Sequence, residues 1–115
     1  MTYGELATLL PTWARRTLDA GVVTNTIAKA NARAAGESYG IDKTLFTGAP
    51  ADEIPVDFGV LLEGAMVEVR RWEDDPESAE IHAQNYTLAM AAWQKSWDQE
   101  NLCAGPLVAP QMVRG

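Results

Sequence analysis

Cysteine, histidine and basic residues are all scarce in this chain of 115 residues, and no long apolar run occurs in it. The single cysteine, Cys103, excludes an internal disulfide and a zinc site built from cysteines. Every apolar run falls short of the ~20 residues that a transmembrane helix needs. The first ten residues also lack the basic start and apolar stretch of a signal peptide. The sequence therefore predicts a soluble intracellular protein without a membrane partner, with a length that corresponds to one domain.

Acidic residues outnumber basic ones, and they are unevenly placed. The chain has nine Lys and Arg against sixteen Asp and Glu, which gives a net charge of −7. Residues 1–50 carry a net charge of +1, whereas residues 51–115 carry −8. This balance argues against nonspecific binding to nucleic acid or to an anionic membrane. The bases of the first half are expected to meet acids, on this chain or on a copy of it: Arg15, Arg16, Lys29 and Arg33.

Groups that could carry catalysis are sparse. The one histidine, His82, falls on the apolar row of a predicted helix, where a partly buried core residue is the expected role. Ser78 lies four residues earlier, but no nucleophile elbow surrounds it. The acids of residues 73–80 do not form a calcium-binding loop, and the glycine at position 48 does not open a phosphate-binding loop. We therefore expect no enzymatic activity, no cofactor and no metal site.

Apolar periodicity predicts an all-α fold, a small four-helix bundle with a C-terminal helical hairpin. Thr2 and Glu5 have the spacing of a capping box and begin the first helix. Pro11 is expected to end or kink this helix, with Trp13 pointing inward on any further turn. The second helix is predicted over about residues 22–39, where apolar residues recur at spacings of four and three.

The third and fourth helices are predicted over about residues 56–72 and 76–97 and are joined by a tight acidic turn. Asp75 is a good N-cap, and proline suits the first helical position that follows it. We expect Gly64 to mark a close helix crossing. One apolar row is expected on each helix: Phe58, Leu62, Ala65, Val69 and Trp72 on the third, and His82, Tyr86, Ala89, Met90, Trp93 and Trp97 on the fourth.

Two segments show no helical period. Residues 40–55 contain glycine and proline and are predicted to form a loop, with a short extended piece at residues 43–47. Residues 101–115 contain two prolines and two glycines and yet several apolar side chains. We therefore divide the chain into a helical domain, residues 1–100, and an extended C-terminal arm, residues 101–115, that docks on a partner. The apolar residues expected to make this contact are Leu102, Leu107, Val108, Met112 and Val113.

Two blocks of the sequence resemble a known family. The first is MTYGEL, followed by a helix that contains IAKANAR at residues 27–33. The second is LLEGAMVE at residues 61–68, then the acidic turn WEDDPESA at residues 72–79, then residues 86–93. Together they cover about two thirds of the chain, and they resemble the head-to-tail adaptor (connector) proteins of tailed bacteriophages. This chain resembles a short member, because residues 40–55 leave no room for the β-rich segment of longer relatives.

The resemblance implies a ring, commonly of twelve copies, in the neck of the virion at the head-tail junction. Its implied partners are the portal protein, which the C-terminal arm contacts, and a tail or nozzle protein. Double-stranded DNA would pass through without specific binding, because a carboxylate-lined channel repels phosphates. The implied place of assembly is the cytoplasm of the host bacterium. The acids of the second half are the candidates to line the channel: Glu63, Glu68, Glu73, Asp74, Asp75, Glu77 and Glu80.

Two function classes therefore remain open. The first is a structural ring adaptor between portal and tail. The second is a small helical regulatory or protein-interaction module without enzymatic activity, binding its partner through an aromatic face. Four tryptophans in so short a chain fit both, since large aromatic residues supply cores and also anchor interfaces.

Overall fold

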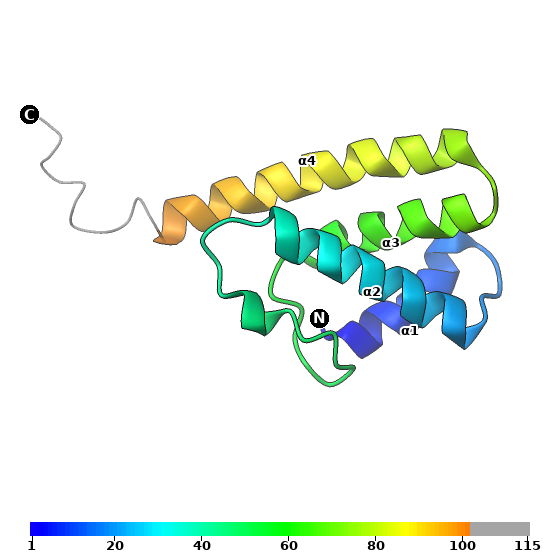
Figure 1. Ribbon diagram of the computed structural model, residues 1–115, viewed down its shortest axis with the longest axis horizontal. Helices are drawn as coiled ribbons and strands as arrows, with labels where there is room; N and C mark the ends of the chain where they lie inside the picture. Colours follow the sequence, from blue (N-terminus) through cyan, green and yellow to red (C-terminus); the bar gives the residue numbers. More distant parts are fainter. Residues whose placement is uncertain (102–115) are drawn as a thin grey trace, which may run out of the picture.

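The computed structural model of the protein describes residues 1–101. Four α-helices and a single turn of 3₁₀-helix follow one another: α1 (Tyr3–Ala14), α2 (Ala20–Glu37), η1 (Lys43–Leu45), α3 (Phe58–Trp72) and α4 (Pro76–Asn101). No strand occurs within these residues; one isolated antiparallel bridge joins Thr2 to Glu53. The prediction of an all-α bundle is confirmed (Figure 1).

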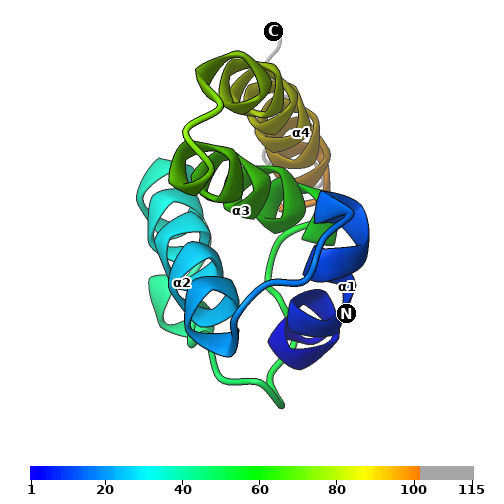
Figure 2. The ribbon, with the colours of Figure 1, turned by 90° about the vertical axis from the view of Figure 1, so that its right-hand side faces the viewer.

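Helix α3 lies at the centre of the molecule, with α4 on one side and α1 and α2 on the other (Figure 2). Eight of its fifteen residues are buried, and they are not confined to one narrow row: Val60, Leu61, Leu62, Gly64, Ala65, Met66, Val67 and Val69. A helix that is apolar on nearly all sides must be covered on several sides. Its composition therefore places α3 between the other helices.

Helices α3 and α4 form the predicted antiparallel hairpin (Figure 1). Asp75 caps α4, because its Oδ1 accepts a hydrogen bond from the backbone N–H of Ser78 at 3.2 Å. Asp74, just before it, has a left-handed backbone with φ of 61° that completes the turn. The predicted apolar row of α4 faces α3, with Tyr86 and Met90 buried and His82 and Trp93 half-buried.

The predicted burial of the apolar row on α3 is wrong at both ends of the helix. Leu62, Ala65 and Val69 are buried as expected, but Phe58 and Trp72 are exposed. These two residues are the first and last of the helix. At a helix end the neighbouring elements turn away, so a residue in the right phase still lacks a partner to cover it.

Helix α1 begins as predicted and ends differently. The Thr2 side chain accepts a hydrogen bond from the Glu5 backbone, and the Glu5 carboxylate accepts one from Thr2, which is the complete capping box. The helix continues through Pro11 to Ala14, so this proline does not end it, and Trp13 is exposed rather than inward. Leu6, Leu10 and Ala14 share the buried face, and Trp13 lies at the edge of this face in the last turn of the helix, where no neighbouring element covers it.

The loop between α2 and α3 is tied to the end of α4. The side-chain amide of Gln94 bonds to the backbone of Tyr39 in both directions, at 2.8 and 2.9 Å. Gly40 has φ of 84°, and a Cβ there would lie 2.7 Å from the Trp97 ring. The expected extended piece at residues 43–47 is wrong, because Lys43–Leu45 forms the 3₁₀ turn η1, which the Asp42 side chain caps at the Thr44 backbone.

Candidate functional site

The acids expected to line a channel fall into two groups, of which the first is paired within the chain. On α3, the Glu63 carboxylate lies 2.7 Å from Nδ1 of His82, so the histidine has the partly buried, packed position expected of it. Glu68 lies 3.2 Å from the Arg71 guanidinium and 3.9 Å from the Lys29 ammonium. These two carboxylates face other helices and contribute to the cohesion of the bundle.

Glu73 is the most strongly held of the paired acids. Its two carboxylate oxygens accept hydrogen bonds from Arg70 and Arg16, both at 2.7 Å. Burial opposes ionisation here, but the bonds and charges of the two guanidinium groups outweigh it and lower the pKa of Glu73. Because Arg16 also stacks over the Trp72 ring at 5.0 Å, this cluster joins the end of α1 to the end of α3.

The second group of acids lies at the α3–α4 turn and the start of α4. Asp74, Glu77 and Glu80 are exposed, and none forms an ion pair with another of residues 1–101. Asp75 is half-buried and is used as the cap of α4. Within the described part of the chain, three of the acids expected to line a channel are therefore unpaired at the end of the bundle where the hairpin turns (Figure 1), while other unpaired acids, such as Asp19 and Asp52, lie elsewhere.

The bases of the first half mostly meet acids of this chain, as expected. Arg33 pairs with Glu37 at 3.0 Å along α2, and its guanidinium also lies over the Tyr86 ring at 4.1 Å. Arg16 and Lys29 pair with α3 acids, as described above. Arg15 instead ends α1 in a left-handed conformation, with φ of 58°, and forms no ion pair within residues 1–101.

Large apolar side chains are exposed on several parts of the bundle, including Tyr39 and Leu45 on the loop between α2 and α3. On the outer face of α4, Ile81 and Leu88 are 58% and 69% exposed and lie two helical turns apart. Where α1 and α3 end, Trp13 and Trp72 are 49% and 51% exposed. Large apolar side chains left exposed in a small bundle can serve as anchors of protein–protein contacts.

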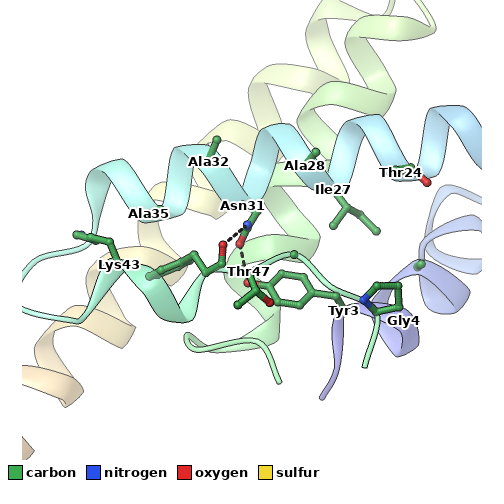
Figure 3. A pocket seen from close by; sticks show the side chains of 14 residues that line it. Tyr3, Gly4, Thr24, Ile27, Ala28, Asn31, Ala32, Ala35, Lys43 and Thr47 are labelled. Atoms are coloured by element: carbon green, nitrogen blue, oxygen red, sulfur yellow. Dashed lines mark hydrogen bonds between the residues drawn. The ribbon is translucent and has the colours of Figure 1, made fainter. Parts of the chain in front are cut away.

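Another surface is hollowed. A groove of about 510 Å³ runs along α2 between this helix, the start of α1 and the segment of residues 43–50 (Figure 3). Its walls are largely apolar; Ile27, Ala28, Ala32 and Phe46 are among them. Two hydrogen bonds hold its floor: the Tyr3 hydroxyl donates to Oδ1 of Asn31 at 2.7 Å, and Nδ2 of Asn31 donates to the Phe46 carbonyl at 3.1 Å.

The groove is the feature that sequence reasoning did not find. The alanines at positions 28, 32 and 35 favour helix formation, and neither they nor Asn31 indicate a groove by themselves. The signal was present as small side chains on the α2 face that turns away from α3. It became informative only when residues 43–50 were placed opposite that face, which no local pattern indicates.

The expectations for the C-terminal arm concern residues that the structure does not describe. Leu102, Leu107, Val108, Met112 and Val113 all lie outside residues 1–101.

Within residues 1–101, no three His, Cys, Asp or Glu side chains are grouped so that they could hold a metal ion. In the same part of the chain, no helix is both long and apolar enough to cross a membrane.

Comparison with known protein families, with curated proteins and with solved structures found no match to this chain.

Proposed function

We propose that the protein is a structural head-to-tail adaptor of a tailed bacteriophage, which forms a ring between portal and tail in the neck of the virion. One observation carries the proposal: large apolar side chains are exposed at different places on the bundle, Ile81 and Leu88 on α4 and Trp13 and Trp72 where α1 and α3 end among them. A closed ring is built from heterologous contacts, in which one surface of a subunit meets a different surface of the next. A chain with two such surfaces supplies both halves of that contact.

The free acids agree with a channel in such a ring. Asp74, Glu77 and Glu80 are exposed at one end of the hairpin and without a partner among residues 1–101. Carried by every subunit, they would form a negative rim that repels DNA phosphates and lets the duplex slide. Of the predicted channel-lining residues, these three suit the role best, since Glu63, Glu68 and Glu73 are already paired within the chain.

The arm completes the proposal. Residues 101–115 would dock on the portal protein through their apolar side chains, and the ring would multiply this contact by its copy number. The repeated contact compensates for an ordering cost of roughly 1–2 kcal/mol per residue in each arm. The adaptor acts by contact alone, without catalysis, and its assembly belongs in the cytoplasm of the host bacterium.

The test is to image the protein with and without the portal protein of the same virus, by native mass measurement and negative-stain microscopy. We expect a ring, alone or on the portal. Leu88→Glu should prevent assembly, because it places a charge on the α4 surface, whereas Thr87→Glu, on the adjacent exposed position of α4, should assemble normally. A monomer or dimer under both conditions would refute the ring and favour the second class, a small helical interaction module.

A further inference from the structure

We propose that the groove along α2 is an intramolecular docking site, and that its occupant is the C-terminal segment of the same chain, residues 102–115. The proposal concerns the free subunit, in which the segment covers the subunit's own apolar groove; docking of the same segment on a portal protein would require it to leave the groove first. It rests on the reach of the segment, its side chains and its single charge.

The groove needs an elongated apolar occupant. It extends along α2 from Thr24 at one end to Ala35 and Lys43 at the other, which is a length of about 16 Å at 1.5 Å per helical residue (Figure 3). Between these ends the lining is largely apolar: alanine, isoleucine and phenylalanine side chains lie beside Tyr3, Asn31 and Thr47. Apolar surface of this kind is stabilised by removal from water, at about 25 cal/mol per Å².

The C-terminal part of α4 is tied to the loop that leads to one end of the groove. Gln94 is bonded to the backbone of Tyr39, and Trp97 packs against Gly40. Three residues after Gly40 comes Lys43, which lines the groove. Asn101, one turn beyond Trp97, therefore ends α4 on the side of the bundle where the Ala35–Lys43 end of the groove lies.

The segment is long enough to fill the groove. Fourteen residues follow Asn101, and at about 3.3 Å each they span at most ~46 Å. The first five could lead from α4 to the groove, and the remainder exceeds its length of about 16 Å. A segment tethered this close has a high effective concentration at the site, of millimolar order, so its own chain is favoured over a second copy.

The composition of the segment matches the walls. Leu107, Val108, Met112 and Val113 are apolar, and no acid or lysine occurs in residues 102–115. Pro106 and Pro110 also remove two backbone N–H groups, which would otherwise need partners inside an apolar groove. These residues therefore bring apolar area at a reduced cost in unsatisfied hydrogen bonds.

One charge gives the segment a direction. Arg114 is its only charged side chain, and it lies near the far end from α4. Beside the Tyr3–Gly4 end of the groove, the Asp52 carboxylate accepts a hydrogen bond from the Thr47 hydroxyl and has no ion-pair partner among residues 1–101. An ion pair between Arg114 and Asp52 would fix the segment with its residue 102 end at Lys43 and its residue 114 end near Gly4.

The test follows the far end of the segment in the full chain. A spin label is attached at Val113→Cys in a chain that also carries Cys103→Ser, and the backbone N–H signals are recorded by NMR. We expect strong broadening for the residues at the Thr24–Gly4 end of the groove, and no comparable broadening on the outer face of α4 around Leu88. Uniform weak broadening, or broadening elsewhere, would overturn the proposal.

A mixing experiment identifies whose segment is bound. Isotope-labelled chains without a spin label are mixed with spin-labelled chains without the isotope. We expect no broadening in this sample; broadening at the groove would show that the occupant comes from a second copy and would refute the intramolecular assignment. A ring could still form in that case, so the outcome is separate from that of the imaging experiment.

Charge exchange tests the ion pair and the orientation together. Arg114→Glu should reduce the broadening at the Gly4 end at least several-fold, and adding Asp52→Lys should restore it. Ala32→Glu, at an exposed position of the groove wall, should abolish it while the helical content stays unchanged. Unaltered broadening in Arg114→Glu would refute the role of the ion pair, and unaltered broadening in Ala32→Glu would refute the groove as the site.

Discussion

The crossing of α2, α3 and α4 at Gly64 gives the sharpest test of the fold. A Cβ added there would lie 3.1 Å from the Cβ of Ala30 and 3.2 and 3.3 Å from two carbons of the Tyr86 ring. Carbon atoms pack best at 3.5–4.0 Å, so the methyl would be compressed from two sides at once. Adding one carbon to a closely packed core costs about 1–3 kcal/mol, whereas replacing glycine by alanine within a helix gains about 1 kcal/mol.

We therefore expect Gly64→Ala to lower the free energy of unfolding by about 1 kcal/mol in urea denaturation, in spite of the better helix former. Gly36→Ala is the matched control, because a Cβ at that helical position meets nothing within 4 Å. It should raise the free energy of unfolding by about 0.5 kcal/mol. If Gly64→Ala stabilised the protein as much as the control does, α3 would not be enclosed between α2 and α4 and the packing described above would be wrong.

Three further substitutions test local features, each by urea denaturation. Thr2→Ala should cost about 1 kcal/mol, because it removes the hydroxyl that caps α1; no loss would show that the capping box is not formed. Met90→Ala should cost about 2–5 kcal/mol, since this side chain is buried between α4 and its neighbours, and a loss below about 0.5 kcal/mol would place the row in solvent. Glu73→Gln should cost about 1–2 kcal/mol through its two arginine partners. Since the pKa of Glu73 is lowered in the folded state, its contribution is present above the unfolded value of 4.5 and is lost as the pH falls through the folded value. The difference in stability between wild type and Glu73→Gln should therefore narrow as the pH falls below 4.5, and a constant difference would contradict this assignment.

The helices themselves could be predicted because their signals are local. A capping box needs only Thr2 and Glu5, and the start of α4 needs only Asp75 and the proline after it. The same holds for the hairpin, since a short turn between two apolar helices leaves them antiparallel. Gly64 was also interpreted correctly, because a glycine beside alanine in an apolar helix has few explanations other than a close crossing.

Burial at the helix ends could not be predicted in the same way. Phe58, Trp72 and Trp13 are large and apolar, and a sequence pattern places such residues inside, yet all three are exposed. Whether an end residue is covered depends on where the next element goes, and this is set by packing far away in the sequence. A related reason explains why Pro11 does not end α1: Leu10 and Ala14 are buried on either side of it, and their packing favours continuation of the helix.

The candidate site, too, could be predicted only in part. Negative charge in the second half of the chain is visible in composition, but which acids remain unpaired depends on partners that are distant in sequence, as Arg16 is from Glu73.

The central position of α3 explains which acids are paired and which surfaces stay exposed. Because α3 is apolar on most sides, it occupies the interior, and its few carboxylates must find partners there or at its rim. Helix α4 then rests mainly on α3 and keeps a free outer face, while α2 leaves its alanine face turned toward the groove. The surfaces that this protein offers to partners are thus consequences of which helix is most apolar, and they follow from the core outward.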